Sequence, residues 1–251
     1  NKSSRLVVDI GSNDGSILKG FKNLGFNVLG IEPTNIARIA NRDGIKTLQE
    51  FFTIKTSKKI KKKFGSASII TASNVFAHVN KLSNLLKGIH NLLEDDGLFV
   101  SESHYLGSII DTFQFDSIYH EHLKYYSIQP LKLLLEKHNF IFEKVEKISN
   151  YGGSIRVYAR KAENGFSMGP SVKSLLKDEI KKGIYKERTY KHFSKKIKDF
   201  KKNFQRKILT LRSQKKSIIG IGCPGRAMTL LEYCGLDNKL IDYVAEQKTS
   251  L

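Results

Sequence analysis

Residues 5–15 read RLVVDIGSNDG, and this stretch decides the fold. It begins with a run of β-branched residues, 5–10, and continues into a turn with two glycines, 11–15. Apolar residues then recur at helical spacing, at Ile17, Leu18, Phe21 and Leu24. β-branched runs favour strands, and recurrence every three or four residues favours a helix. We therefore predict a strand, a glycine turn and a helix in succession.

The same alternation continues along the chain. We expect further strands at 27–31, 68–72 and 97–102 and helices at 34–41, 82–93 and 131–138. This order predicts right-handed βαβ crossovers and a mostly parallel sheet with helices on both faces. Two later strands, 140–148 and 154–160, are expected to close the sheet in antiparallel fashion. The fold class is therefore α/β, with residues 1–165 as the first domain.

A different pattern follows over residues 166–216, which we interpret as a basic helical linker. Its apolar residues predict one long amphipathic helix after a shorter one at 172–180; they are Phe193, Ile197, Phe200, Phe204, Ile208 and Leu211. A strand at 217–221, a helix at 227–233 and a strand at 240–244 then indicate a second Rossmann-like domain. We expect residues 217–251 to be its beginning, cut short.

The formal net charge of +19 suggests an anionic partner, and nucleic acid is the first class to consider. Residues 161–217 hold 18 basic and 5 acidic residues, mostly lysines with few of the aromatic or arginine side chains that stack on bases. This distribution favours solvated helix faces over a polynucleotide site. A phosphorylated small substrate would be attracted by the same field.

Other function classes are excluded by composition. No run of about 18 apolar residues is present, so we expect no membrane span. Two cysteines are too few for a disulfide framework or a zinc cluster, which favours a reducing cytoplasm. The first residues leave no room for a signal peptide, and without an initiator Met we expect a piece of a longer protein.

The turn after the first strand resembles the nucleotide-binding motif of class I S-adenosylmethionine methyltransferases. It lacks the G-x-G-x-x-G spacing of dinucleotide sites, and its candidate residues are Asp9, Gly11, Ser12, Asn13 and Gly15. Glycines let a backbone approach a ligand closely. Glu32, followed by Pro33, closes the second predicted strand, where a carboxylate can accept both ribose hydroxyls.

Two more segments follow predicted strands. Residues 74–78, Asn-Val-Phe-Ala-His, come at the carboxyl edge where such sheets bind ligands, although Val75 and Phe76 could simply cap the core. Residues 115–126, FDSIYHEHLKYY, concentrate two of the seven histidines, one glutamate and three tyrosines. His120 and His122 could ligate a metal, but no further ligands with supporting spacing occur, so we expect none. A histidine base oriented by a carboxylate suits proton abstraction, and spacing leaves open which histidine it is.

These motifs together resemble the deoxysugar C-methyltransferases over nearly the whole chain. The segments that carry the resemblance are 9–15 (DIGSNDG), 74–78 (NVFAH), 114–122 (QFDSIYHEH), 151–156 (YGGSIR), 222–226 (GCPGR) and 233–235 (YCG). The resemblance implies a zinc-binding N-terminal module, missing here, a methyltransferase domain, and a C-terminal domain that helps bind a nucleotide-linked sugar. The family's acidic-x-Pro-Tyr is Glu102-Ser-His-Tyr105 in this chain, and Arg226 stands where small residues or lysine are usual.

The resemblance also implies the chemistry. S-adenosylmethionine would donate a methyl group to a nucleotide-diphosphate-linked 4-keto deoxysugar and become S-adenosylhomocysteine. The implied cofactor residues are Asp9, Gly11, Ser12, Asn13, Gly15, Glu32, Pro33, Asn74, Val75, Phe76 and His78. His122 would generate the enolate, Tyr119 would hydrogen-bond the keto oxygen, and Glu121 would position His122 or bind the sugar. The implied substrate residues are His120, Tyr151, Arg156, Gly222 and Arg226.

Two other classes of function stay open from the sequence. A nucleic-acid methyltransferase would use the same cofactor fold, and its binding would weaken steeply with salt. A noncatalytic module would bind the cofactor or a nucleotide sugar without transferring a methyl group. The pattern makes no prediction about the oligomeric state.

Overall fold

The computed structural model describes residues 5–246, and these form two compact units. The first unit contains the described residues up to Leu106 together with Leu123–Lys181. The second contains Gly107–His122 and the described residues from Lys182 onwards. The segment with Tyr119 and His122 thus groups with the C-terminal part of the chain, and the domain boundaries expected near 165 and 217 stay predictions.

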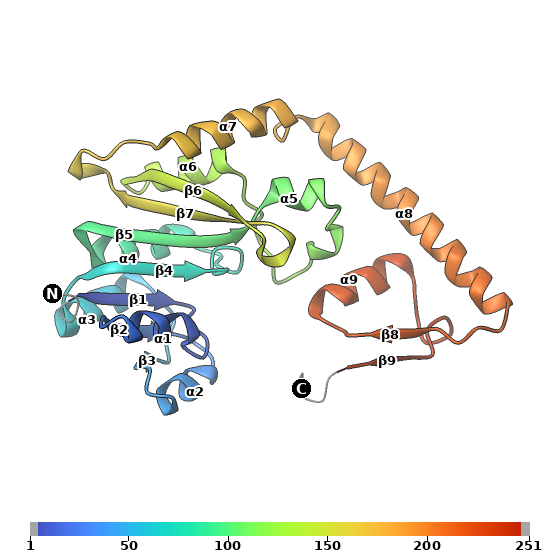
Figure 1. Cartoon of the computed structure of the whole chain (residues 1–251), viewed down its shortest axis with the longest axis horizontal. Helices are drawn as coiled ribbons and strands as arrows, with labels where there is room; N and C mark the ends of the chain where they lie inside the picture. Colours follow the sequence, from blue (N-terminus) through green and yellow to red (C-terminus); the bar gives the residue numbers. More distant parts are fainter. Residues whose placement is uncertain (1–4, 247–251) are drawn as a thin grey trace. The chain divides into compact units, whose positions relative to one another are not determined.

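The first unit is built on a seven-stranded sheet in the order β3-β2-β1-β4-β5-β7-β6 (Figure 1). Its strands are β1 (Leu6–Ile10), β2 (Asn27–Ile31), β3 (Thr47–Leu48), β4 (Ala67–Ser73), β5 (Leu93–His104), β6 (Phe140–Ile148) and β7 (Ser154–Lys161). β1 to β5 pair in parallel, and β7 pairs antiparallel with both β5 and β6. The predicted mostly parallel α/β fold with an antiparallel closing pair is confirmed.

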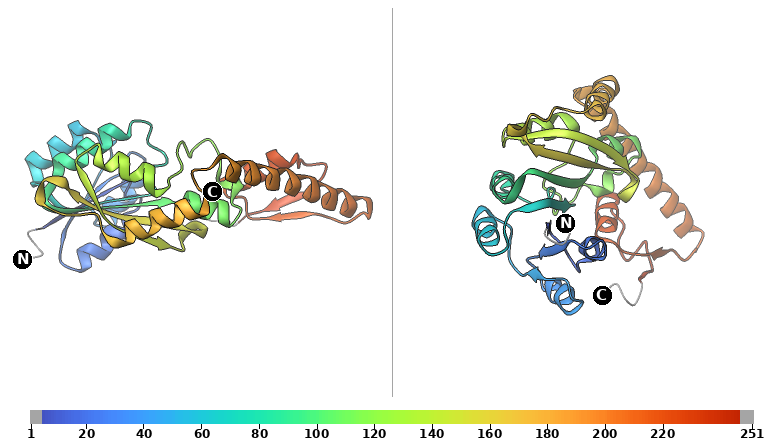
Figure 2. Two further views of the ribbon diagram at one scale, coloured as in Figure 1. Left: turned by 90° about the horizontal axis from the view of Figure 1, so that it is seen from above. Right: turned by 60° about the vertical axis from the view of Figure 1, so that its left-hand side comes forward.

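Helices cover both faces of this sheet (Figure 2). They are α1 (Ser16–Asn23), α2 (Ile36–Arg42), α3 (Ile54–Phe64), α4 (Leu82–Leu92), α6 (Ile128–Glu136) and α7 (Pro170–Lys182). The short α5 (Leu106–Asp111) follows β5 in the chain and, from Gly107 onwards, belongs to the second unit. Short 3-10 turns occur at η2 (Phe115–Ser117), η3 (Asn150–Gly152) and η4 (Ala162–Asn164). Apolar strand residues such as Val8, Ile70 and Phe99 are completely buried between the helical layers, so the core is formed by near-continuous hydrophobic strands.

Helix α3 and strand β3 are among the elements that the sequence-based expectation did not include. Helix α3 has the sequence IKTSKKIKKKF, in which Ile60 is the buried apolar side chain, so its apolar periodicity is too weak to predict it. Its start is capped by Thr53, whose Oγ1 accepts a hydrogen bond from Thr56 N at 3.2 Å. The two-residue strand β3 is held at the sheet edge by parallel pairing with β2, which is a long-range contact rather than a local signal.

The second unit contains the predicted long helix, α8 (Glu187–Ser213), followed by β8 (Ile219–Ile221), α9 (Gly225–Cys234) and β9 (Tyr243–Ala245). β8 and β9 pair in parallel, which makes a βαβ unit as expected. An apolar cluster lies inside this unit and consists of Ile208, Cys234 and Leu236 with Phe200, Phe204, Ile218, Leu230, Leu231, Tyr233, Leu240 and Ile241. The last predicted strand is therefore shorter than expected, because Leu240 and Ile241 belong to this cluster instead. None of the helices within residues 5–246 combines the length and apolar character needed to cross a bilayer.

Gly30 on β2 and Gly20 on α1 offer a matched test of packing. A methyl group at Gly30 would lie 2.5 Å from Ser12 Oγ and 2.6 Å from Thr47 Oγ1, whereas one at Gly20 would meet nothing within 4 Å. We expect Gly30→Ala to lower the free energy of unfolding by about 1–3 kcal/mol. Gly20→Ala should raise it by about 0.5–1 kcal/mol, since alanine favours the helix. Urea denaturation measures both free energies of unfolding. Equal stability of Gly30→Ala and the parent protein would contradict the close packing of Gly30 against Ser12 and Thr47.

Candidate functional site

The turn between β1 and α1 presents bare backbone at the carboxyl end of β1. Gly11 has φ +71°, and a Cβ atom there would lie 2.7 Å from Val75 Cγ2. Gly11 N and Ser12 N both donate to the carbonyl oxygen of Ile31, at 2.8 and 3.2 Å. Glycine is thus required at position 11 by both conformation and space. The turn is fixed to the end of β2, and its backbone can approach a ligand.

Glu32 follows β2 and is 7% exposed. Its Oε2 accepts a hydrogen bond from Asn13 N at 3.2 Å, and its Oε1 accepts one from Thr34 N at 2.9 Å. A carboxylate oxygen can accept two hydrogen bonds, so each oxygen retains capacity for one more donor. The carboxylate is therefore held in place with one acceptor position on each oxygen, which suits a pair of ribose hydroxyls.

Asp9 is a buried carboxyl group near the end of β1. Thr71 Oγ1 on the neighbouring strand β4 donates to Asp9 Oδ1 at 2.6 Å. Burial raises the pKa of Asp9 to about 7, the hydrogen bond from Thr71 opposes this, and the negative charge of Glu32 adds to it. A positively charged ligand at this edge of the sheet would favour the ionised form of Asp9.

The loop after β4 contributes to the same edge of the sheet. Asn74 N donates to the carbonyl oxygen of Glu102 on β5 at 2.8 Å. Phe76 is completely buried and stacks on Phe99, while its carbonyl oxygen accepts from Tyr126 Oη at 3.0 Å. The side chain of Phe76 therefore anchors the loop in the core. This agrees with the second of the two roles considered for Phe76, in which it caps the core and does not contact a ligand. Val75, which approaches Gly11, and the exposed His78 are the side chains nearer to the surface.

These residues fit the nucleoside part of S-adenosylmethionine. The turn at Gly11 has no side chain to cover its backbone, since Val75 leaves no room for a Cβ atom there, and Glu32 has acceptor capacity for both ribose hydroxyls. When bound, S-adenosylmethionine would supply an electrophilic methyl group. Across residues 5–246, no three His, Cys, Asp or Glu side chains are placed so that they could hold a metal ion.

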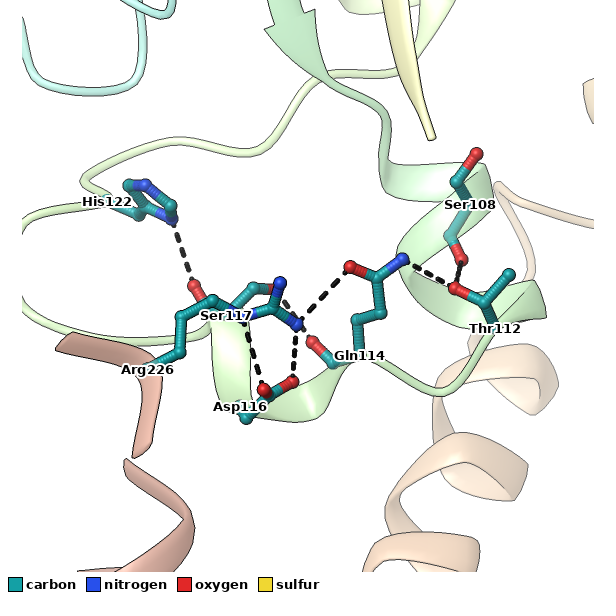
Figure 3. A network of polar contacts seen from close by, with 7 residues as sticks. All are labelled: Ser108, Thr112, Gln114, Asp116, Ser117, His122 and Arg226. Carbon is teal, nitrogen blue, oxygen red and sulfur yellow. Dashed lines mark hydrogen bonds and ion pairs between the residues drawn. The ribbon is translucent and has the colours of Figure 1, made fainter. Parts of the chain in front are cut away.

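In the second unit, His122 is held at both ring nitrogens, and Figure 3 shows its contact with Ser117. Its Nδ1 lies 3.0 Å from the carbonyl oxygen of Ser117, and its Nε2 lies 3.3 Å from Tyr119 Oη. A carbonyl oxygen can only accept, so Nδ1 carries the proton and Nε2 accepts from the Tyr119 hydroxyl. When the imidazole is neutral, this arrangement leaves Nε2 as its basic nitrogen, and that nitrogen faces the Tyr119 phenol.

The neighbouring residues differ in exposure. His120 is 89% exposed in its side chain, and its Nε2 lies 4.0 Å from Glu121 Oε1, which is also exposed. The pKa of Tyr119 is raised, first by burial and then by the negative charge of Glu121, while Arg226 opposes the shift. Tyr119 is therefore a protonated donor at neutral pH.

The two predicted substrate arginines have carboxylate partners within their own units. Arg156 Nη2 lies 3.0 Å from Oε2 of the buried Glu102, which raises the pKa of the guanidinium. Arg226 holds Asp116 with two contacts, Nη2 to Oδ1 at 2.8 Å and Nε to Oδ2 at 3.1 Å, as Figure 3 shows. The sequence-based prediction did not identify Glu102 and Asp116 as these partners. The antiparallel register of β5 and β7 places Glu102 opposite Arg156, and this register is known only from the structure.

The remaining predicted substrate residues lie in tight turns. Tyr151 in η3 has φ 55° and a side chain that is 64% exposed. Gly222 follows β8 with φ +76°, and its N–H donates to the carbonyl oxygen of Ala245 at 2.8 Å. A left-handed conformation is costly for tyrosine, so the surrounding turn must hold Tyr151 in this exposed position.

Comparison with protein families matches nearly the whole chain. Residues 1–145 match the model of a methyltransferase domain, and residues 149–250 match that of a C-methyltransferase C-terminal domain. The C-methyltransferase NovU of Streptomyces niveus is 33% identical over 242 residues, which cover 96% of this chain and 58% of that protein. The chain thus spans less than two thirds of the length of this relative.

Solved structures share the fold of the first unit. A SAM-dependent methyltransferase from Archaeoglobus fulgidus is 18% identical, with a TM-score of 0.51 over 64% of this chain and 87% of that chain. An O-methyltransferase of Brevibacillus brevis in complex with S-adenosyl-L-homocysteine is 12% identical, with a TM-score of 0.50 over 69% of this chain and 77% of that one. These structures confirm the class I, Rossmann-like fold.

Asp9 should make stability depend on pH. Its pKa is raised from 3.8 to about 7 in the folded state, so the unfolded state binds fewer protons between these values. The free energy of unfolding should therefore fall as pH rises from about 4 to 7, by at most about 1.4 kcal/mol per pH unit. Asp9→Asn can still accept from Thr71 and should flatten this fall, as measured by urea unfolding at pH 5 and pH 7. Asp43→Asn, on the surface, is the control, and an unchanged slope in Asp9→Asn would contradict the assignment.

Glu32 should control cofactor affinity. Removing a charged hydrogen-bond acceptor costs about 1.5–3 kcal/mol, so Glu32→Ala should weaken S-adenosylhomocysteine binding about 10- to 100-fold. Isothermal calorimetry checks this, with Glu136→Ala on the exposed face of α6 as the control and circular dichroism to verify folding. Unchanged affinity in a folded Glu32→Ala protein would show that the ribose lies elsewhere.

Proposed function

Since the chain belongs to the methyltransferase-domain family, and its residues 149–250 match a C-methyltransferase C-terminal domain, we propose that its protein methylates a carbon of a nucleotide-diphosphate-linked 4-keto deoxysugar. The observation that carries this proposal is the His122 imidazole, whose basic Nε2 faces a phenol donor. Carbon is a poor nucleophile until a base removes its proton, whereas methylation of an oxygen or a nitrogen needs less activation. A fixed base beside a fixed donor is what enolate formation requires.

His122 is the proposed base. Its Nε2 takes the proton from the carbon next to the keto group, and the electron pair of that C–H bond becomes the enolate. The enolate carbon forms the new C–C bond, and S-adenosylhomocysteine is the leaving group. His122 then carries the proton and returns it to solvent. His120 is less suited to this role, because its imidazole is almost fully exposed.

Tyr119 is the proposed donor to the keto oxygen. Its hydroxyl is engaged with His122 Nε2 at 3.3 Å, a long hydrogen bond that a substrate can replace. When the keto group enters, the Tyr119 hydroxyl would donate to the keto oxygen instead of to His122 Nε2. The same change would leave Nε2 free to take a proton. The hydrogen bond from Tyr119 strengthens as negative charge builds on the enolate oxygen, so it acts mainly on the transition state.

We assign recognition of the substrate to exposed groups close to Tyr119 and His122 in the sequence and to the turn η3. His120 and Glu121 are exposed polar groups that can bind sugar hydroxyls, and Tyr151 offers an exposed aromatic ring. The formal net charge of +19 attracts a diphosphate over long range.

Cys223 and Cys234 are free thiols, which fits the reducing cytoplasm where nucleotide sugars would be modified.

The test uses the full-length protein with S-adenosylmethionine labelled in its methyl group and a panel of 4-keto nucleotide sugars. Mass spectrometry should locate the label on a carbon. His122→Asn should keep S-adenosylhomocysteine binding and lose about 10²- to 10⁴-fold in transfer rate. It should also lose exchange of the sugar's acidic hydrogen with deuterated water, because that exchange reports enolate formation alone.

His192→Asn, on the exposed surface of α8, is the matched control and should transfer at the parent rate. Tyr119→Phe should slow transfer with little change in substrate affinity. Label on oxygen, transfer to a polynucleotide instead of a sugar, or parent rates in His122→Asn would each contradict the proposal.

A further inference from the structure

Arg226 holds both ends of a short segment in the second unit (Figure 3). It is the second residue of α9, and its guanidinium donates to Asp116 Oδ1, to Asp116 Oδ2 and, from Nη2, to Gln114 Oε1 at 3.3 Å. Gln114 and Asp116 flank Phe115 at the start of the 3-10 turn η2. We call Arg226, Asp116 and Gln114 the arginine clamp. The planar fork of arginine can bind a carboxylate and an amide oxygen together, which a lysine ammonium does less well.

The clamp connects to His122 through the backbone of η2. Ser117 N and Ser117 Oγ both donate to the carbonyl oxygen of Gln114, at 3.1 and 2.7 Å. Ile118 N donates to the carbonyl oxygen of Phe115 at 3.0 Å, which fixes the plane of the peptide group between Ser117 and Ile118. The carbonyl of that same peptide group accepts from His122 Nδ1. The orientation of this carbonyl therefore depends on the turn η2. Arg226 holds the side chain of Asp116 within this turn and that of Gln114 just before it.

Helix α9 also approaches the other partner of His122. Gly225 begins the helix, and a methyl group there would lie 4.0 Å from Cε2 of Tyr119. The start of α9 thus packs beside the Tyr119 ring while its next residue holds η2. One helix end therefore supports the groups that contact both nitrogens of the imidazole.

We propose that Arg226 is a positioning residue: the arginine clamp fixes the Ser117 carbonyl and thereby keeps His122 in the tautomer with the proton on Nδ1. This inference rests on the proposed role of His122 as the base, and it replaces the substrate-binding role expected for Arg226. In the opposite tautomer the proton sits on Nε2, and that nitrogen cannot accept one from carbon. Loosening the clamp should therefore reduce the fraction of competent enzyme without removing any group that touches the substrate.

The chain offers a matched control pair in the same unit. Arg212 Nη1 binds both carboxylate oxygens of Asp242, at 2.8 and 3.0 Å, and both side chains are 31% exposed. Arg226 and Asp116 are also 31% exposed each, so the two ion pairs have similar solvent screening. Arg212 holds the region before β9 through the Asp242 carboxylate and the Lys239 carbonyl, both of which lie outside η2. Arg212→Lys therefore reports the general cost of losing an arginine fork in this unit.

The test measures the tautomer directly on full-length protein labelled with ¹⁵N in histidine. Long-range ¹H–¹⁵N spectra distinguish a protonated from an unprotonated ring nitrogen, and His122→Asn assigns the signal. The parent protein and Arg212→Lys should show the proton of His122 on Nδ1. Arg226→Lys and Asp116→Asn should show a mixture of tautomers, and their deuterium exchange into the 4-keto sugar should fall about 10- to 100-fold, as for other residues that orient a functional side chain. S-adenosylhomocysteine affinity should stay at the parent value.

The outcomes separate this inference from the proposed function. If Arg226→Lys keeps the parent tautomer and exchange rate, the clamp has no positioning role, although His122 can still be the base. A higher KM for the sugar with an unchanged tautomer would return Arg226 to substrate binding and overturn the inference. If the parent protein exchanges no sugar hydrogen, the proposed function fails, while the tautomer spectra still decide the role of Arg226. Should Asp116→Asn fail to fold, Arg226→Lys and Arg226→Gln provide the same comparison.

Discussion

Parallel pairing of β1 with β2 and β4 is the constraint on which the candidate cofactor site depends. Parallel strands bring their carboxyl ends to one edge of the sheet. That edge gathers Asp9 beside Thr71 and sets Glu32 within reach of Asn13. Both of these contacts join residues that are far apart in the sequence, whereas the contact of Glu32 with Thr34 is local. The site therefore exists only once the sheet has formed. The glycine at position 11 then follows from the register, because Val75 from the next loop fills the space of a side chain.

Sequence reasoning was strongest where chemistry and local pattern coincide. The turn at 11–15 and Glu32 were predicted as cofactor residues because glycines and a closing acid have a recognisable spacing after strands, and their role stays a prediction. Helix α3 was missed because its lysines hide a single buried apolar position, Ile60. Arg156 and Arg226 were interpreted as substrate ligands because the resemblance to the deoxysugar C-methyltransferases implied it. Their partners Asp116 and Glu102 lie 110 and 54 residues away, and separations of that size carry no local signal.

Charge in this protein has two separate roles. The excess of lysine produces a long-range positive field, yet the arginines at motif positions are neutralised by carboxylates within their own units. Asp9 is the reverse case, an acid that burial pushes toward its neutral form. A buried carboxyl that titrates near neutral pH costs stability in the empty protein and becomes favourable when a cation binds nearby. The field therefore acts over long range, as the proposed attraction of an anionic substrate requires, whereas the buried and paired groups concern the geometry of the two candidate sites.

The choice of a backbone carbonyl as the partner of His122 Nδ1 has a chemical consequence. A carboxylate there would fix the same tautomer, but its negative charge would also stabilise the protonated imidazole. A catalytic base must release its proton after each turnover, so excessive stabilisation of the protonated form would slow the return step. A neutral carbonyl held by η2 fixes the direction of the ring and the position of its proton with less effect on charge. The direction of the carbonyl then has to be fixed by the turn η2 itself. The hydrogen bonds within η2 and the proposed arginine clamp together restrain that turn.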